Sequence, residues 1–146
     1  MPGIIVGVDG SGHSQRALEW AMKEAALRHE ALTVITVHQA VKGYYGTAVV
    51  NPEDRALTEQ AREAAQAETD KVLAELGESR PDSVTVKAVN GYPVEELLAA
   101  ADDADIIVLG SRGAGGFTRL LLGSVSSQIA QHAHCPVLIV PAEDNK

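Results

Sequence analysis

The segment between Gly110 and Ser124 has the residue types and the spacing of a phosphate-binding loop. It reads GSRGAGGFTRLLLGS, which is the pattern G-x2-G-x9-G-S, and it directly follows the apolar residues 106–109. Gly110 and Gly113 let backbone N–H groups approach an anion, because no Cβ stands in the way. Gly123 and Ser124 begin the next predicted helix, whose free N–H groups and positive dipole end favour negative charge. The segment therefore predicts a site for the phosphates of a ligand.

Two better-known phosphate motifs do not fit this segment. No Gly-Lys-Ser/Thr follows the glycines, as a Walker A loop requires, and the dinucleotide fingerprint G-x-G-x-x-G is missing as well. Without a P-loop lysine, the charge of the ligand must be met by other groups. These are backbone N–H groups, the hydroxyls of Ser124 and Ser126, Arg112 or Arg119, and a divalent metal ion.

The elements that must position this loop alternate along the chain. Apolar runs predict five strands, at residues 4–8, 32–37, 84–89, 105–109 and 136–140. Periodic apolar positions predict four helices between them, at residues 14–28, 53–76, 93–101 and 124–133, with Leu57, Ala61, Ala65, Val72 and Leu76 turned toward the sheet. This alternation predicts an α/β fold, with a parallel sheet covered by helices on both faces.

The composition of the strands predicts their order. The run SVTVKAV alternates polar and apolar residues and suits an edge, whereas IIVGV and DIIVLG are apolar throughout and suit the centre. A doubly wound sheet in the order 3-2-1-4-5 fits, with its switch point between strands 1 and 4. Ligands bind at such a point, outside the carboxyl ends of the strands. We therefore expect Asp9, after strand 1, and Gly110, at the end of strand 4, to face one crevice.

Asp9 has two interpretations. In one, Asp-Gly-Ser forms an Asx turn before the helix. In the other, which its place at the switch point favours, the carboxylate accepts hydrogen bonds from a ribose hydroxyl or an adenine amine. The long loop at residues 40–52 leaves a choice open as well, because Tyr44 and Tyr45 suit a cover for a bound base and suit a surface or dimer contact equally.

The last strand predicts a homodimer. Residues 136–140 are apolar on both faces but lie at an edge of the predicted sheet. An uncovered apolar edge is an aggregation hazard, which pairing with the same strand of a second copy removes.

Composition narrows the functional classes. The 146 residues suit a single domain over 1–146, and a net charge of −8 with one Trp, three Tyr and one Phe argues against nucleic acid as a partner. One cysteine excludes an internal disulfide, and neither a signal peptide nor a membrane span is expected, so we expect a cytoplasmic protein. His132, His134 and Cys135 lack the spacing of a zinc site, and we expect them to be structural.

Several segments resemble the universal stress protein family. The resemblance covers essentially the whole chain, and the G-x2-G-x9-G-S motif marks the ATP-binding branch of that family. The matching segments are VDGS at 8–11, VH at 37–38, DIIVLGSRG at 105–113, LGSVS at 122–126 and CPVLIV at 135–140.

The resemblance implies a Rossmann-like domain, similar to the adenine nucleotide alpha hydrolases, that dimerises through its last strand and binds ATP with magnesium. Asp9 would meet the adenosine, and Gln39, where the family often has an apolar residue, would line the base. The residues that would hold ribose and phosphates are Gly110, Gly113, Gly123, Ser124, Val125 and Ser126.

We therefore expect a regulatory ATP-binding protein of the stress response. No confident general base is present, so any ATP hydrolysis should be slow, and no catalytic residue is assigned. A cyclic-AMP-binding module, an enzyme of the ATP-pyrophosphatase class and a flavodoxin-like flavin binder stay open as alternatives. The pyrophosphatase needs Ser-Gly-Gly-x-Asp-Ser after strand 1, which residues 11–14, Ser-Gly-His-Ser, match only shallowly.

Overall fold

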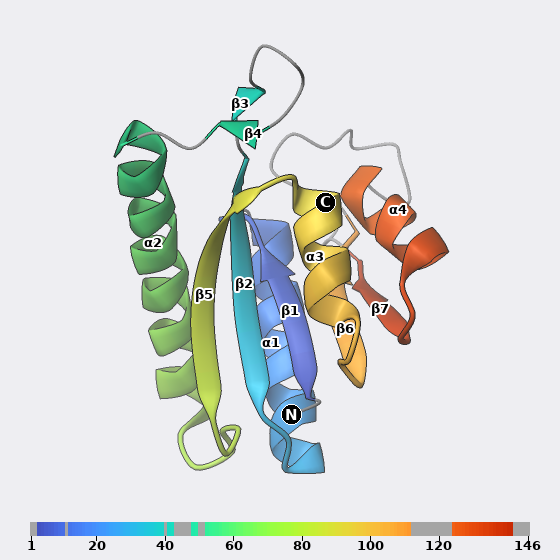
Figure 1. Cartoon of the computed structure of the whole chain (residues 1–146). Helices are drawn as coiled ribbons and strands as arrows, with labels where there is room; N and C mark the ends of the chain where they lie inside the picture. The colour runs from blue at the N-terminus through green and yellow to red at the C-terminus, as the bar shows by residue number, and fades with distance from the viewer. Residues whose placement is uncertain are drawn as a thin grey trace, which may run out of the picture.

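The computed structural model describes residues 3–10, 12–39, 41–42, 48–49, 52–111 and 124–141. Strands and helices alternate along the chain, as predicted (Figure 1). The strands are β1 Ile4–Val8, β2 Leu32–Gln39, β3 Val41–Lys42, β4 Ala48–Val49, β5 Val84–Gly91, β6 Ile106–Gly110 and β7 Val137–Val140. The helices are α1 Gly12–Arg28, α2 Pro52–Leu76, α3 Pro93–Ala101 and α4 Ser124–His132.

Five strands form a parallel sheet in the order β5-β2-β1-β6-β7. The predicted order 3-2-1-4-5 is therefore confirmed. At the centre, Val6 of β1 lies between Val34 of β2 and Val108 of β6. The predicted loop at residues 40–52 also contains a short antiparallel pair, β3 with β4, which the sequence analysis missed. Two-residue strands are too short to leave a periodic signal.

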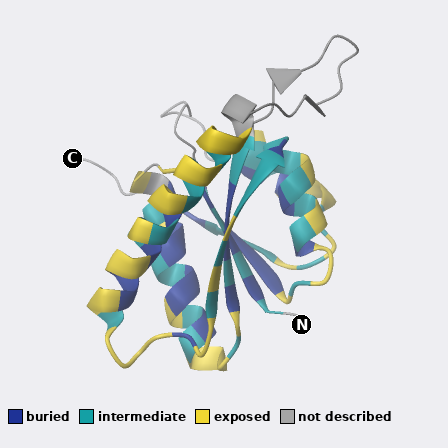
Figure 2. Ribbon diagram, turned by 60° about the vertical axis from the view of Figure 1, so that its left-hand side comes forward, coloured by how far each residue is buried: buried dark blue, intermediate teal, exposed yellow. Residues whose placement is uncertain are grey.

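Two hydrophobic layers hold the helices against the sheet. Helices α1 and α2 cover one face, and α3 and α4 cover the other (Figure 1). Alternate side chains of the strands enter the two layers, so Val6 and Val108 pack with Leu18 and Met22 under α1. The opposite layer contains Ile35, Leu97, Ala101, Ile107, Leu109 and Ile129. Figure 2 shows the result, with buried residues along the strands and on the inner sides of the helices.

One predicted contact of α2 is wrong. Leu57 was expected to face the sheet, but it is 46% exposed. The buried stripe of this helix runs through Ala65, Thr69, Val72 and Leu73, and the Thr69 hydroxyl donates to the Ala65 carbonyl at 2.7 Å. An α-helix has 3.6 residues per turn, so this stripe continues toward the N-terminus at positions 61 and 58. Leu57 falls outside it.

Gly7 determines how closely α3 approaches the central strand. A Cβ at this position would lie 2.9 Å from Leu109 Cδ2 and 3.2 Å from Leu97 Cδ2. Both leucines are buried, so neither can move away without disturbing the layer under α3 and α4.

We predict that Gly7→Ala lowers the free energy of unfolding by about 1–3 kcal/mol, the usual effect of overpacking a core. Gly12→Ala is the matched control, because a Cβ at Gly12 would meet nothing within 4 Å and alanine favours a helix. Urea unfolding of the wild type and both variants measures the difference. Equal stability of the two variants would contradict this account of Gly7.

Two carboxyl groups meet at the opposite end of the sheet from the glycine loop. A hydrogen bond with Asp105, and then burial, raise the pKa of Glu30 above its ordinary value. Glu30 Oε2 is buried and has no hydrogen-bond partner, while nearby Arg28 donates to Glu24 at 2.7 Å. Two ionised carboxylates cannot hydrogen-bond to each other, so this contact needs a proton on one of them.

This carboxyl pair predicts a pH-dependent stability. The pKa of Glu30 is raised in the folded state. The contact therefore contributes fully to the free energy of unfolding below the ordinary pKa of 4.5, and this contribution is lost as pH rises through the raised pKa. Glu30→Gln keeps a donor at all pH values. We therefore expect its stability relative to the wild type to rise between about pH 4.5 and about pH 7.5. Urea unfolding at both pH values measures this, with Glu75→Gln as the exposed control, and a constant difference would contradict it.

Candidate functional site

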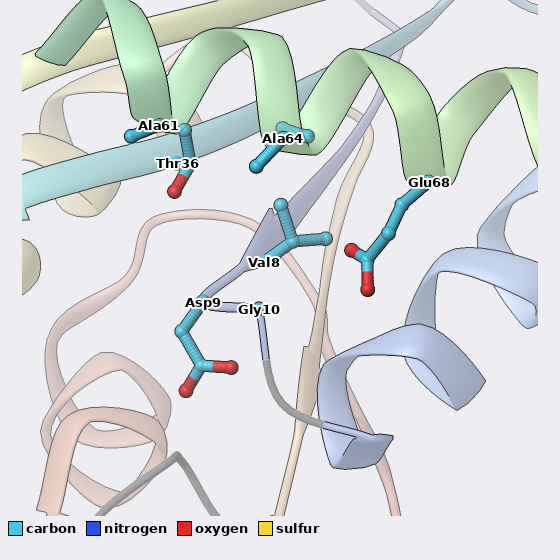
Figure 3. Close-up of a pocket in the computed structure, with 8 residues that line it drawn as sticks. Val8, Asp9, Gly10, Thr36, Ala61, Ala64 and Glu68 are labelled. Atoms are coloured by element: carbon cyan, nitrogen blue, oxygen red, sulfur yellow. The ribbon is translucent and has the colours of Figure 1, made fainter.

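A pocket opens where the chain passes from β1 to α1, beneath the N-terminal half of α2. Its volume is about 210 Å³. It lies at the carboxyl ends of β1 and β2, the edge of the sheet at which ligands of doubly wound folds bind. The lining residues are Val8, Asp9, Gly10, Thr36, Ala61, Ala64, Ala65 and Glu68 (Figure 3).

A tight turn shapes the floor of this pocket. Gly10 has φ +83°, a conformation that glycine adopts without strain, and a Cβ there would meet nothing within 4 Å. The Asp9 N–H donates to Oγ of buried Ser14 at 3.2 Å, which fixes the start of α1 relative to β1. The Asp9 side chain is exposed, and its carboxylate points away from α2 in Figure 3. The turn thus presents this carboxylate at the crevice.

The opposite wall is a flat face of α2. Ala61, Ala64, Ala65 and Glu68 have the spacing of one helix face, and all four line the pocket. The alanines leave room above Val8 and Thr36, and a larger side chain in their place would fill it. The pocket therefore results from small residues on this face of α2.

Glu68 has an altered acidity in this setting. Burial, and then the charge of Asp9, raise the pKa of Glu68, while Lys71 opposes them. Within the part of the chain that the structure describes, Glu68 forms no hydrogen bond or ion pair. The sequence analysis did not single out Glu68. The sequence could have indicated it, because Glu68 lies three and seven residues after Ala65 and Ala61, which were expected to face the sheet.

The two ends of the glycine segment are held together beside this pocket. Gly110 ends β6, and the N–H of Ser111 donates to the Val140 carbonyl at 3.0 Å. Ser126, in the first turn of α4, donates its hydroxyl to the Ser111 carbonyl at 3.4 Å, and both serines are buried. The beginning of α4 is thus fixed at the end of β6, next to the end of β1.

The His132–Cys135 segment lies elsewhere. His134 Nδ1 lies 3.1 Å from Asp102 Oδ1 on the surface. Burial raises the pKa of Cys135, against a backbone hydrogen bond from Ile107 that lowers it. Among the described residues, no three His, Cys, Asp or Glu side chains gather into a group that could hold a metal ion. None of the helices described here combines the length and the apolar composition that a membrane span requires.

Comparison with known proteins identifies the family. The model of the Universal stress protein family matches residues 2–141. The chain belongs to the universal stress protein family. Universal stress protein Rv1996 of Mycobacterium tuberculosis is 35% identical to it over 153 residues, covering 97% of this chain and 48% of the relative. The chain spans about half the length of the curated relatives it matches.

Solved structures agree with the fold. The hypothetical protein MJ0577 is similar with a TM-score of 0.71 and 26% identity, and the match covers 99% of each chain. A universal stress protein solved in complex with cAMP is similar with a TM-score of 0.61 and 29% identity, covering 96% of each chain. The sheet order and the flanking helices are thus those of the universal stress protein fold.

The predicted site residues that the structure of this universal stress protein describes lie at one edge of the sheet. Asp9 lines the pocket, and Gly110 ends the neighbouring strand. In α4, Ser124 is exposed, Val125 is half-buried against the layer under α3, and Ser126 is buried. Gln39 ends β2, paired with Gly91, but its side chain is outside the described residues. Also outside them are Gly113, Gly123, Arg112, Arg119, Tyr44 and Tyr45.

Proposed function

We propose that this universal stress protein binds ATP in a regulatory role, at the carboxyl ends of β1, β2 and β6. The observation that carries the proposal is the pocket beside Asp9, which opens at the switch point of the sheet. We also propose that it acts in the cytoplasm, since a single cysteine suits a reducing compartment. These proposals concern this chain, which is about half as long as its curated relatives.

Charge favours one orientation of the nucleotide. Asp9 lines the pocket beside Glu68, and an ionised carboxylate repels phosphate. At α4, by contrast, a helix N-terminus with exposed Ser124 favours an anion. We therefore place the adenosine at Asp9 and Gln39, and the phosphates at Gly110, Gly113 and the start of α4. This orientation disfavours the ATP-pyrophosphatase class, whose phosphate loop would lie after β1.

Two features of the ligand follow from this orientation. We propose that a magnesium ion accompanies ATP and is held mainly by the phosphate oxygens, because the described residues offer no cluster of metal ligands. We also propose that hydrolysis is slow at most. The carboxyl groups of the pocket lie at the adenosine end in this orientation, too far from the terminal phosphate to act as a general base.

Cyclic AMP is the second candidate ligand. A similar universal stress protein has been solved in complex with cAMP. Both ligands present the same adenosine to Asp9, but cAMP carries a single phosphodiester charge. The two candidates therefore differ in how much they depend on the glycine loop.

Substitutions at the two ends of the ligand test this function. We expect Asp9→Ala to weaken ATP and cAMP alike, because both lose a hydrogen bond to the adenosine. We expect Gly113→Val to weaken ATP at least about tenfold, because a branched side chain would block the approach of phosphate to backbone N–H groups. Calorimetry measures both, with exposed Asp82→Ala, before β5, as the control. Unchanged ATP affinity in folded Gly113→Val would remove the loop from the site.

We further propose a homodimer through β7. The helices already half-cover its apolar side chains, Leu138 under α1 and Ile139 beside α4, so the side chains alone do not demand a partner. The backbone edge is the stronger argument. The carbonyls of Pro136 and Val140 accept from β6, which leaves the peptide groups of Val137 and Ile139 pointing outward.

We predict that Ile139→Pro gives a folded monomer. Proline removes an outward N–H that a partner strand would need and leaves the bonds to β6 in place. Light scattering at micromolar concentration measures the mass, and circular dichroism checks the fold. A wild type that is already monomeric under these conditions would contradict the dimer.

A further inference from the structure

The pocket under α2 has the size and shape of a subsite for one ring system. Its volume of about 210 Å³ is below the ~300–1,000 Å³ of sites that enclose a whole drug-sized ligand. Its wall on α2 consists of the methyl groups of Ala61, Ala64 and Ala65. A flat apolar wall of this kind suits the face of a planar base. Glu68 and Asp9 supply carboxyl groups at the rim, which suit the polar edge of such a base and not a phosphate.

Glu68 is positioned to meet that edge. It lies one turn beyond Ala64 and Ala65 on the same face of α2. In Figure 3 its side chain descends from α2 on the side of Gly10, and the Asp9 carboxylate lies farther from α2 and points away from that helix. No protein group in the described part of the chain is shown to hold the Glu68 carboxyl, which is therefore available to a ligand.

We propose that Glu68 selects the base: its carboxyl group hydrogen-bonds the edge of an adenine ring that lies against Ala61, Ala64 and Ala65. This inference rests on the proposed adenine nucleotide function and names the side chain that recognises the base. Adenine presents an amine donor beside a ring-nitrogen acceptor. A neutral carboxylic acid offers one donor and one acceptor to match, as the amide of Asn or Gln does when it reads adenine. An ionised carboxylate offers acceptors only and matches the two N–H donors of guanine instead.

The surroundings of Glu68 favour the neutral form. Burial, and then Asp9 after β1, raise its pKa, and Lys71 on its own helix opposes them. Of the other titratable groups nearby, His38 lies two residues beyond Thr36 on the same side of β2. On α1, Arg16 donates to the Pro141 carbonyl and is engaged there. Adenine binding through neutral Glu68 takes up a proton wherever the free carboxyl is ionised, so affinity falls as pH rises through that range.

Glu68→Gln separates this role from a structural one. The amide offers the same donor and acceptor as the neutral acid but needs no proton. We expect Glu68→Gln to bind ATP more tightly than the wild type, and we expect this advantage to grow, up to about tenfold, as pH rises from about 5 to about 8. Comparing the two proteins at each pH cancels the titration of the triphosphate. We expect Glu68→Ala to lose about tenfold in the preference for ATP over GTP.

Calorimetry with ATP and with GTP, at both pH values, measures these affinities. Glu75→Gln is the control, an exposed carboxyl on the same helix. If the wild type binds ATP and neither Glu68 variant changes the affinity, the inference is wrong and the proposed function stands. If the wild type does not bind ATP, the proposed function itself fails. A wild-type preference for GTP, or an effect of Glu68→Gln that vanishes with EDTA, would assign Glu68 to guanine or to a metal ion and overturn the proposal.

Discussion

The pairing of β1 with β2 on one edge and β6 on the other is the constraint on which the rest of this structure depends. The chain leaves β1 toward α1 on one face of the sheet and leaves β6 toward α4 on the other. The connections therefore diverge, and the carboxyl ends of the two strands border the crevice at which ligands of doubly wound sheets bind. Gly7 lets α3 lie close to β1, and the turn at Gly10 directs Asp9 toward this crevice.

The charges around the crevice are unevenly distributed. The chain carries a net charge of −8, and the pocket under α2 contains two carboxyl groups. The N-terminus of α4 provides a local positive end beside it. The proposed orientation fits this distribution, with the phosphates at the start of α4 and the neutral end of the ligand at the carboxyl groups. The Glu30–Asp105 pair lies at the other end of the sheet and belongs to the stability of the fold.

The sequence predicted the fold more completely than the site, for a physical reason. Strand order follows from which runs are apolar throughout and which alternate, and both patterns survive small errors in position. A prediction of which helix face is buried does not survive such errors, because a shift of one residue turns the face by about 100°. For that reason Leu57 was placed wrongly and Glu68 was overlooked. Asp9 and Gly110 were placed at the right edge because each directly follows or ends a strand, whereas the roles of Gln39 and Gly113 stay predictions.

The hydrogen bond from Ser126 to the Ser111 carbonyl joins the end of β6 to the start of α4. This bond thus holds together the two elements between which the segment 112–123 lies. Closing a loop depends weakly on its length, with each doubling adding about 0.6 kcal/mol. A change in the length of this segment should therefore cost the fold little in closure entropy.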